Sequence, residues 1–288
     1  MPELPEIEIV KQSLEKKVKY KIIDTVIVKN PNLRFKIKNT FKEFLKKKRI
    51  ISVDRRSKYL IIGLEDNKFL LIHFGMSGTL HICFKKKKNN LYSNLSFYNS
   101  MKLPKKHNHV EIFFSNFKII YNDPRRFGFF KTLNSKKKIN EYFKKIGPEP
   151  FDSTFSIKYL QKKMYNKDKN IKNFLLDQSF VAGIGNIYAN EILFYSKINP
   201  LKKGKEISEN EIRKIIKYSK QVLKKAIKKG GSSIKNFKNI KGINGSYQKE
   251  FKIYDKEDKI CPTSNCNEKI VKLNISNRSS YVCNVCQK

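Results

Sequence analysis

The spacing of apolar residues changes at one place along this chain, the segment Gly147-Pro148-Glu149-Pro150. Before this segment, short runs rich in β-branched and aromatic residues are separated by turn residues, which is typical of antiparallel strands. After it, apolar residues recur at the spacing of amphipathic helices. Because glycine and proline interrupt both kinds of element, the sequence predicts an α+β protein with a domain boundary here.

The part before the boundary is expected to form a two-layer antiparallel β-sandwich preceded by one helix. Apolar residues at helical spacing from Leu4 to Leu14 predict that helix. The expected strands cover residues 21–28, 50–53, 58–64, 69–74, 109–114, 117–121 and 127–132. The polar, asparagine-rich stretch Lys85–Lys106 shows neither period, so we expect a long loop there.

The part after the boundary is expected to be helical and to end in short strands around four cysteines. A short helix is predicted just before the boundary at residues 136–146, and helices are predicted after it over residues 156–165, 170–176, 186–195 and 208–229. The last is the clearest, because Ser208 and Glu211 form a capping box at its start and Gly230 follows its end. The predicted domains are residues 1–135, a linker helix and boundary at 136–150, residues 151–245, and a cysteine-rich domain at 246–288.

Four cysteines near the end of the chain occur as two close pairs separated by 16 residues. They are Cys261, Cys266, Cys283 and Cys286. Two such pairs suit one tetrahedral Zn²⁺ held by four thiolates, and the metal is expected to be structural because protein ligands would fill every position. Two disulfides or four unrelated thiols are the alternatives. Cys83 lies apart in the sequence and is expected to be a buried core residue.

The charge of the chain indicates its kind of partner. Lysine and arginine number 63 against 25 aspartate and glutamate residues, a net charge of +38, which favours a polyanion. No apolar run approaches the roughly 18 residues of a membrane span, and the acidic N-terminus is unlike a secretory signal. We therefore expect a cytoplasmic protein in a reducing compartment, with no membrane partner.

The first residues, Met1-Pro2-Glu3-Leu4-Pro5-Glu6, place a proline and carboxylates at a helix start. If Met1 is removed, Pro2 presents a secondary amine, and an α-amino group titrates at about pH 8, so part of it is unprotonated at neutral pH. Attack of this amine on a sugar C1′ would give a permanently charged iminium, with Glu3 moving protons beside it. An ordinary helix start is the alternative from these residues alone.

Two turns offer groups that bind nucleic acid. Gly183-Ile184-Gly185-Asn186 opens a helix whose free N–H groups suit a phosphate, although a tight connection between helices is the alternative. The turn at residues 123–128 carries Arg125 and Phe127, which suit a base edge or phosphate and insertion into a base stack. A β-turn with solvated arginines and a core phenylalanine is the alternative there.

Two other segments are less specific. Arg55-Arg56-Ser57-Lys58 places basic residues before a strand, which alone is typical of a solvated edge. The segment from His73 to Gly78 ends a strand and carries Met76 between two glycines, where a core methionine at a bulge is the alternative.

Together these motifs resemble those of formamidopyrimidine-DNA glycosylases over nearly the whole chain. In order they are PELPEIE at 2–8, RRSKYL at 55–60, HFGMSGTL at 73–80, DPRRFG at 123–128, GPEP at 147–150, VAGIGNIYANE at 181–191, GGSSIKNF at 230–237 and the four-cysteine tail. The resemblance implies an N-terminal helix and β-sandwich, a helix–two-turn–helix domain and a C-terminal zinc finger. It further implies an enzyme that excises 8-oxoguanine and formamidopyrimidines from double-stranded DNA and cuts abasic sites by β,δ-elimination. We expect a monomer that associates with the nucleoid in the cytoplasm.

The same resemblance implies the roles of individual residues. Pro2 would be the nucleophile that forms an iminium with C1′, and Glu3 the acid, with Glu6 as a second carboxylate. Lys58 would donate a proton in β-elimination, and Arg278 would serve δ-elimination and a phosphate contact. DNA contacts are implied for His73, Met76, His107, Arg125, Phe127, Lys167 and Asn186. Of these, Met76, Arg125 and Phe127 would fill the gap left by the everted nucleotide, with Arg125 facing the orphaned cytosine.

The chain departs from the family pattern at several places. The first cysteine pair has four intervening residues where two are usual, Asp255 and Lys256 replace a Gly-Arg, and Ser246 stands where tyrosine is common.

Two other functions stay open from the sequence. An endonuclease VIII-like glycosylase for oxidised pyrimidines usually begins PEGPE, and Leu4 and the Arg125–Phe127 pair argue against it. The other is a zinc-knuckle protein that binds damaged DNA or RNA without cutting it.

Overall fold

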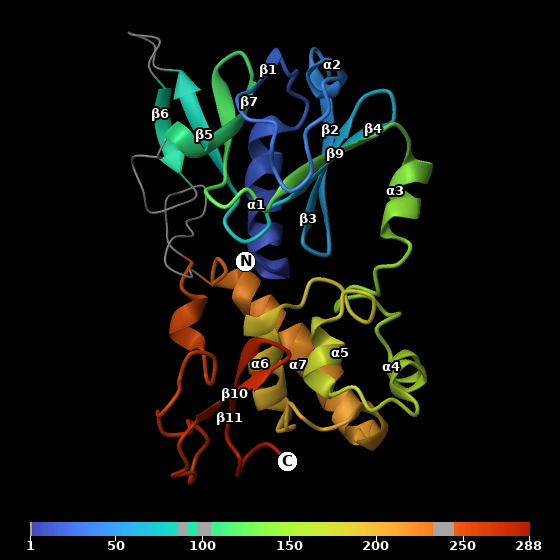
Figure 1. Ribbon diagram of the computed structural model, residues 1–288, viewed down its shortest axis with the longest axis vertical. Coiled ribbons are helices and arrows are strands. Elements are labelled where there is room, and N and C mark those ends of the chain that lie inside the picture. Colours follow the sequence, from blue (N-terminus) through green and yellow to red (C-terminus); the bar gives the residue numbers. More distant parts are fainter. Residues whose placement is uncertain (1, 86–91, 97–104, 233–244) are drawn as a thin grey trace. The chain divides into compact units, whose positions relative to one another are not determined.

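The computed structural model describes residues 2–85, 92–96, 105–232 and 245–288 (Figure 1). The chain forms two compact units. The first comprises residues 1–144 and 229–246, and the second comprises residues 145–228 and 247–288. The chain therefore returns to its first unit after the main helical segment. The expected limits of the domains stay predictions.

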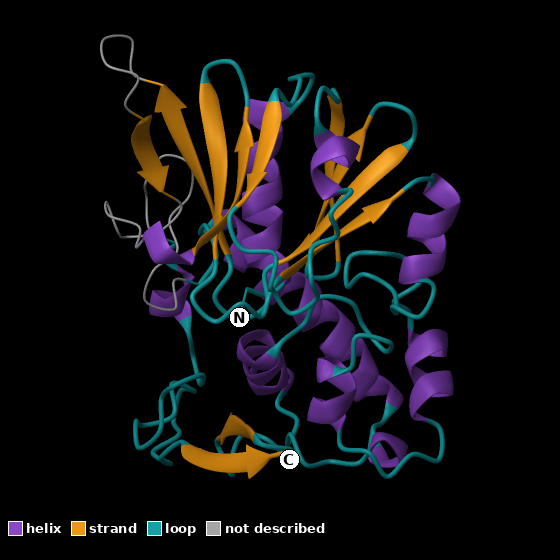
Figure 2. Cartoon of the chain, turned by 45° about the horizontal axis from the view of Figure 1, so that its top comes forward, coloured by secondary structure: helices purple, strands orange, loops and turns teal. Residues whose placement is uncertain are grey.

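The first unit contains two antiparallel sheets (Figures 1 and 2). One has the strand order β1-β7-β8-β5-β6, and the other has the order β2-β3-β4-β9. The strands are β1 (Thr25–Val28), β2 (Ile50–Arg56), β3 (Tyr59–Leu64), β4 (Lys68–His73), β5 (Thr79–Lys85), β6 (Tyr92–Ser96), β7 (Asn108–Phe113), β8 (Phe117–Asn122) and β9 (Phe129–Leu133). This arrangement confirms the predicted two-layer antiparallel sandwich.

Helix α1 (Leu4–Val18) joins the two sheets into one core. It runs between them in both views, and its apolar side chains pack with residues of each sheet (Figure 2). Leu14 and Val18 are fully buried, and each such side chain contributes about 1.5–3 kcal/mol relative to exposure. The short helix α2 (Phe41–Leu45) adds Phe41 and Leu45 to the same core, while α3 (Lys136–Phe143) packs Ile139 on the outer face of the four-stranded sheet.

The second unit is built on helices and a small hairpin. Its elements are α4 (Ile157–Met164), α5 (Ile171–Leu176), α6 (Asn186–Ser196), α7 (Glu209–Lys228), β10 (Val271–Ile275) and β11 (Arg278–Val282). Nine of the eleven residues of α6 are buried, so this helix is the centre of the unit. Short 3₁₀ turns of this unit lie at Gly204–Glu206 and Tyr247–Glu250, and another lies at Lys105–His107 in the first unit. No helix in the described part of the chain is long and apolar enough to cross a membrane.

Several expected elements differ from the observed ones. β6 lies inside the stretch predicted to be one loop, whose other residues, 86–91 and 97–104, are outside the described part. β1 begins at Thr25 rather than residue 21, because Tyr20 has a left-handed backbone (φ 66°) and Ile22 bridges Arg49 instead. β9 begins at Phe129 rather than residue 127, because Arg126 is also left-handed (φ 56°). β5 and α2 were not expected.

Candidate functional site

The start of α1 is held by a buried carboxylate. Glu3 is the N-cap residue, and its backbone N–H donates to Glu6 Oε2 at 2.9 Å. Glu6 Oε1 accepts from the backbone nitrogen and the hydroxyl of Ser232, at 2.8 and 2.9 Å. Glu3 and Glu6 are almost fully buried, and Pro2 is half-buried directly before them. The backbone that carries Pro2 and Glu3 is therefore fixed by hydrogen bonds on both oxygens of Glu6.

Lys58 lies in the tight turn between β2 and β3 and is 7% exposed. Arg55 positions this turn, since its guanidinium donates to the Ser57 carbonyl and forms a 2.9 Å ion pair with Glu8 of α1. Arg55 thus connects the helix that begins beside Pro2 with the turn that carries Lys58. Sequence reasoning treated Arg55 as part of a basic cluster and missed this ion pair, because Glu8 is 47 positions away.

His73 ends β4, and its imidazole is neutral at physiological pH. Burial, together with the positive charges of Lys58 and Arg34, lowers the pKa of His73 to about 4. The ring stacks on Phe129 at 5.2 Å between centroids. Its Nδ1 accepts a hydrogen bond from Gly75 N at 3.1 Å, so the single ring proton resides on Nε2. His73 can therefore donate one hydrogen bond from Nε2 and lies near the Lys58 ammonium.

Met76, Arg125 and Phe127 project from two neighbouring loops of the first unit. Met76 is 47% exposed and Phe127 is 42% exposed. Neither is therefore the core side chain that the alternative interpretations of these two segments predicted. The Arg125 guanidinium lies over the Phe127 ring at 4.5 Å. Exposed apolar side chains beside a cation suit contact with stacked bases.

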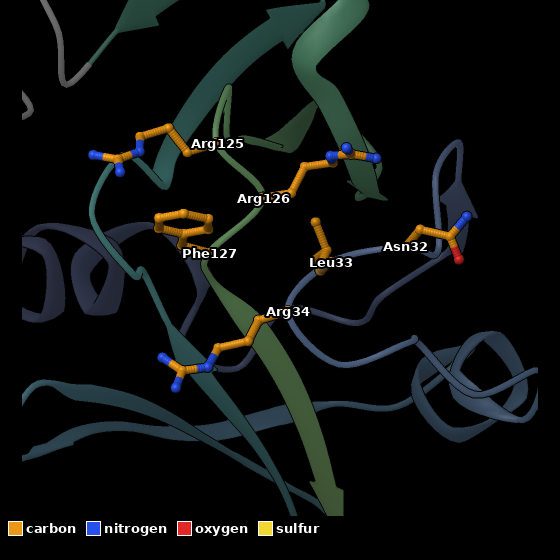
Figure 3. Close-up of a pocket in the computed structure, with 6 residues that line it drawn as sticks. All are labelled: Asn32, Leu33, Arg34, Arg125, Arg126 and Phe127. Atoms are coloured by element: carbon orange, nitrogen blue, oxygen red, sulfur yellow. The ribbon is translucent and has the colours of Figure 1, made fainter.

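A shallow hollow of about 500 Å³ lies beside these residues (Figure 3). It is lined by Asn32, Leu33, Arg34, Arg125, Arg126 and Phe127. Figure 3 shows Arg34 and Arg125 extending to the same side as the Phe127 ring, whereas Arg126 extends away. Arg34 N donates to the Gly128 carbonyl at 3.2 Å, which holds its loop against the turn. Sequence reasoning did not single out Arg34, because a lone arginine in a loop carries no motif.

His107 ends a 3₁₀ turn and is half-buried. Its backbone carbonyl accepts a hydrogen bond from Asp123 N at 3.0 Å. The structure therefore brings His107 to the same turn that carries Arg125 and Phe127.

In the second unit, Asn186 is the first residue of α6. The turn before it is held by Gln178, whose side chain accepts from Gly183 N and donates to the Ile184 carbonyl. Asn186 Nδ2 donates to the Ser279 carbonyl at 2.9 Å. Its Oδ1 is buried and has no hydrogen-bond partner among the described residues. This side chain therefore connects the glycine turn with the β10–β11 hairpin.

Arg278 is exposed at the start of β11, directly after the two-residue turn Ser276-Asn277. Both turn residues have positive φ, as a type I′ hairpin turn requires. The ammonium of Lys172, which is fully buried, donates to the Ser279 carbonyl at 2.9 Å and to the Ser280 hydroxyl at 2.5 Å. Arg278 is thus placed by a hairpin whose base is anchored to α5 and α6.

Lys167 lies in the exposed loop between α4 and α5. Its backbone carbonyl accepts from Lys205 N at 3.1 Å. The DNA contact of its side chain stays a prediction.

The four predicted metal ligands form one cluster. All ligand atoms of Cys261, Cys266, Cys283 and Cys286 lie within 4.8 Å of one another. The Cys261–Cys286 and Cys266–Cys283 sulfur separations are 3.8 and 3.7 Å, too long for disulfides. Sulfurs at about 2.3 Å from a tetrahedral Zn²⁺ lie about 3.8 Å apart, so the cluster fits the predicted structural zinc.

The first knuckle has four residues between its cysteines, and it still brings both thiolates into the cluster. Cys261 N donates to the Glu268 carbonyl at 2.8 Å, and Asn265 adopts positive φ just before Cys266. Cys83 lies elsewhere, buried in β5, and burial raises the pKa of its thiol to about 11. It is therefore the inert core residue that was predicted.

Comparisons with known proteins agree with this architecture. Residues 1–130 match the family described as formamidopyrimidine-DNA glycosylase N-terminal domain, and residues 146–238 match formamidopyrimidine-DNA glycosylase H2TH domain. A formamidopyrimidine-DNA glycosylase of Wolbachia sp. subsp. Drosophila simulans (strain wRi) is 40% identical over 288 residues, covering 100% of both chains.

Two solved structures are similar over 100% of both chains. One is a complex between a Lactococcus lactis FPG mutant and a Fapy-dG containing DNA, with a TM-score of 0.88 and 33% identity. The other is MutM in complex with carbocyclic 8-oxo-G containing DNA, with a TM-score of 0.87 and 34% identity. The two-sheet unit, the H2TH unit and the four-cysteine cluster define an H2TH-type DNA glycosylase. This chain belongs to the formamidopyrimidine-DNA glycosylase family.

Proposed function

We propose that this protein is a bifunctional DNA glycosylase and abasic-site lyase that removes oxidised purines, 8-oxoguanine and formamidopyrimidines, from duplex DNA. One observation supports the assignment most: the buried Glu6 accepts from Glu3 N with one oxygen and from Ser232 with the other, which anchors the backbone that carries Pro2 and Glu3. A nucleophile on a helix start held in this way is kept in one geometry before substrate arrives. Such preorganisation lowers the entropic cost of attack.

The proposed first step is attack of the Pro2 nitrogen on C1′ of the damaged nucleotide. The C1′–N bond to the base breaks, and Glu3 moves the proton that the opening sugar or the leaving base requires. The product is an iminium between Pro2 and C1′, which withdraws electrons from the neighbouring C2′–H bond. C1′ is inaccessible inside a duplex, so the nucleotide must first be turned out of the stack.

The proposed second stage breaks the DNA strand. Loss of the C2′ proton to water breaks the C3′–O bond and releases the 3′-phosphate, and Lys58 donates a proton to the departing phosphate oxygen in this β-elimination. A further elimination breaks the C5′–O bond, with Arg278 at the phosphate, and hydrolysis then releases Pro2. Zn²⁺, when bound by the four cysteines, stabilises the finger and supplies no chemistry to the reacting sugar.

The proposed DNA contacts divide between the two units. Met76, Arg125 and Phe127 would occupy the gap left by the everted nucleotide, with Arg125 facing the orphaned cytosine. His73, His107, Lys167 and Asn186 would contact the DNA backbone, and the net charge of +38 would strengthen binding through counterion release. We place this activity in a monomer in the cytoplasm, at the nucleoid.

Borohydride trapping tests the assignment, because it reduces an iminium to a stable amine. We expect a covalent complex with duplex DNA carrying 8-oxoguanine opposite cytosine, and peptide mapping should find the DNA on Pro2. Pro5→Ala, the other proline of this helix start, should be trapped like the wild type. An adduct on another residue, or Met1 retained in active preparations, would contradict the mechanism. Preferential trapping on thymine glycol would indicate the pyrimidine-specific class instead. DNA binding without any trapping would indicate a non-catalytic protein.

A further inference from the structure

A buried carboxylate connects the two loops that carry Met76, Arg125 and Phe127. Asp123 has no exposed surface, and both of its oxygens accept hydrogen bonds. Oδ1 accepts from the Ser77 hydroxyl at 2.5 Å. Oδ2 accepts from Gly128 N at 2.8 Å and from the Tyr121 hydroxyl at 3.1 Å.

Each partner of this carboxylate lies next to a proposed DNA-contacting residue. Ser77 directly follows Met76, and Gly128 directly follows Phe127. The Ser77 hydroxyl oxygen also accepts from Arg125 N at 3.2 Å, so one serine touches both loops. The Met76 loop and the Arg125–Phe127 turn are therefore bridged by one shared hydroxyl and one buried carboxylate.

The backbone of Asp123 extends this network to a third segment. Asp123 N donates to the His107 carbonyl, and the Asp123 carbonyl accepts from His109 Nε2 at 2.8 Å. Two glycines make the close packing possible. A Cβ at Gly75 would collide with the Phe127 backbone, and one at Gly128 would collide with the Tyr121 hydroxyl.

We propose that Asp123, acting through Ser77 and Gly128, is a positioning residue that presets the separation of Met76 from Arg125 and Phe127 for insertion into DNA. This inference rests on the proposed function, because it concerns how the gap in the stack is filled. Exposed side chains on two independent loops would lose conformational freedom on insertion, and a prearranged pair loses less. A misplacement of about 1 Å in such a site can cost about 100-fold in rate.

Two substrates separate this role from the chemistry of Pro2. Excision of 8-oxoguanine from a duplex needs unstacking and filling of the gap. Cleavage of an abasic site in a single-stranded oligonucleotide needs neither, so it reports Pro2 and Lys58 alone. A 2-aminopurine beside the lesion adds a direct readout, because its fluorescence rises when it is unstacked.

Ser77→Ala is the main variant, since it removes the shared hydroxyl without introducing an unpaired buried charge. We expect kcat/KM for duplex excision to fall about 10-fold, the equivalent of about one charge-assisted hydrogen bond, with slower 2-aminopurine unstacking. Single-strand cleavage should stay unchanged. Asp123→Ala should lose about 100-fold on the duplex. Asp123→Asn should recover most of that loss, because an amide still accepts from Gly128 N and can donate to Ser77.

The matched control is Ser52→Ala. Ser52 is also half-buried in the first unit, and its hydroxyl donates to the Asp54 carboxylate at 2.7 Å, away from these loops. This variant should leave both activities unchanged. An equal effect of Ser77→Ala on both substrates, or no effect on either, would overturn the positioning role even if Asp123→Ala fails to fold. Absence of wild-type trapping on both substrates would instead overturn the proposed function.

Discussion

The carboxylate of Glu6 binds Ser232 twice, at the backbone nitrogen and at the hydroxyl, although 226 positions separate the two residues. Gly231 permits this approach, since it has φ of 80° and a Cβ there would lie only 3.1 Å from Glu6 Oε1. The start of the first helix is therefore held by a segment that follows α7. The chain must complete the helical part of its second unit before the backbone around Pro2 is fixed.

Substitution Glu6→Gln tests this anchor. Gln has one acceptor oxygen where Glu has two, so its NH₂ group must face a buried N–H or hydroxyl donor. Leaving one such donor unpaired costs about 1–3 kcal/mol of the free energy of unfolding. We expect this loss in urea unfolding, together with a reduced rate of borohydride trapping. Glu15→Gln, at a half-buried position of the same helix that pairs with Lys11 and Lys19, should cost no more than about 1 kcal/mol and leave trapping unchanged. Equal behaviour of both variants would contradict the anchor.

Substitution of a zinc ligand should separate metal binding from the rest of the fold. Cys266→Ala leaves three thiolates, so we expect the chain to lose its bound zinc and its strand cleavage, because the hairpin that carries Arg278 is no longer held. Metal analysis and cleavage of abasic DNA provide the two measurements. Cys83→Ala should retain one zinc per chain, since Cys83 lies in a sheet of the other unit. Zinc retention by Cys266→Ala would argue against the four-thiolate site.

Lys172→Met should loosen the hairpin without removing a surface charge. The buried ammonium makes hydrogen bonds to Ser279 and Ser280, and bonds from a charged group contribute about 1.5–3 kcal/mol each. If this hairpin positions Arg278, δ-elimination should slow more than β-elimination, and the β-product should accumulate on sequencing gels. The exposed Lys162→Met is the control for charge. A proportional fall of both products would show that Lys172 serves general stability only.

The stability of the first unit should decrease in mild acid. Burial lowers the pKa of His73 to about 4 and that of His81 to about 3, below the value of about 6.5 for an unfolded chain. Between these values the unfolded state binds more protons, so the free energy of unfolding falls as pH falls below 6.5. At pH 5.5 each histidine should cost about 1.2 kcal/mol relative to pH 7.0.

Urea unfolding at pH 7.0 and 5.5 measures this dependence, and His81→Gln should remove about half of it. Thr79→Val removes the 2.6 Å hydrogen bond to His81 but leaves the imidazole buried, so the pH dependence should persist. An unchanged pH dependence in His81→Gln would contradict burial as its cause.

Local signals in the sequence predicted most of the elements. The Ser208–Glu211 capping box is present, with Ser208 N donating to Glu211 at 2.8 Å, because both partners lie within one helical turn. The cysteine spacing predicted the metal cluster for a similar reason, since each pair lies on one short knuckle. β6 was missed because asparagine-rich segments carry no strand signal, and its pairing with β5 supplies the order instead.

The candidate site was predicted unevenly. The family resemblance predicted which residues form the site, but it did not predict the contacts that position them. The Arg55–Glu8 ion pair, the Lys172 anchor and the Asp123 network each join residues far apart in the chain. Such contacts leave no periodic pattern, because neither partner has to occur at a fixed spacing from the other.

The alternation of strands and helices, the four-thiolate cluster and the side chains available to a DNA lyase could all be predicted from the chain, since each depends on neighbours within a few residues. The contact of Glu6 with Ser232, and the carboxylate that spans the Met76 and Arg125 loops, follow from the folded arrangement alone. The physical reason is burial. A carboxylate removed from water must find its donors wherever the folded chain brings them.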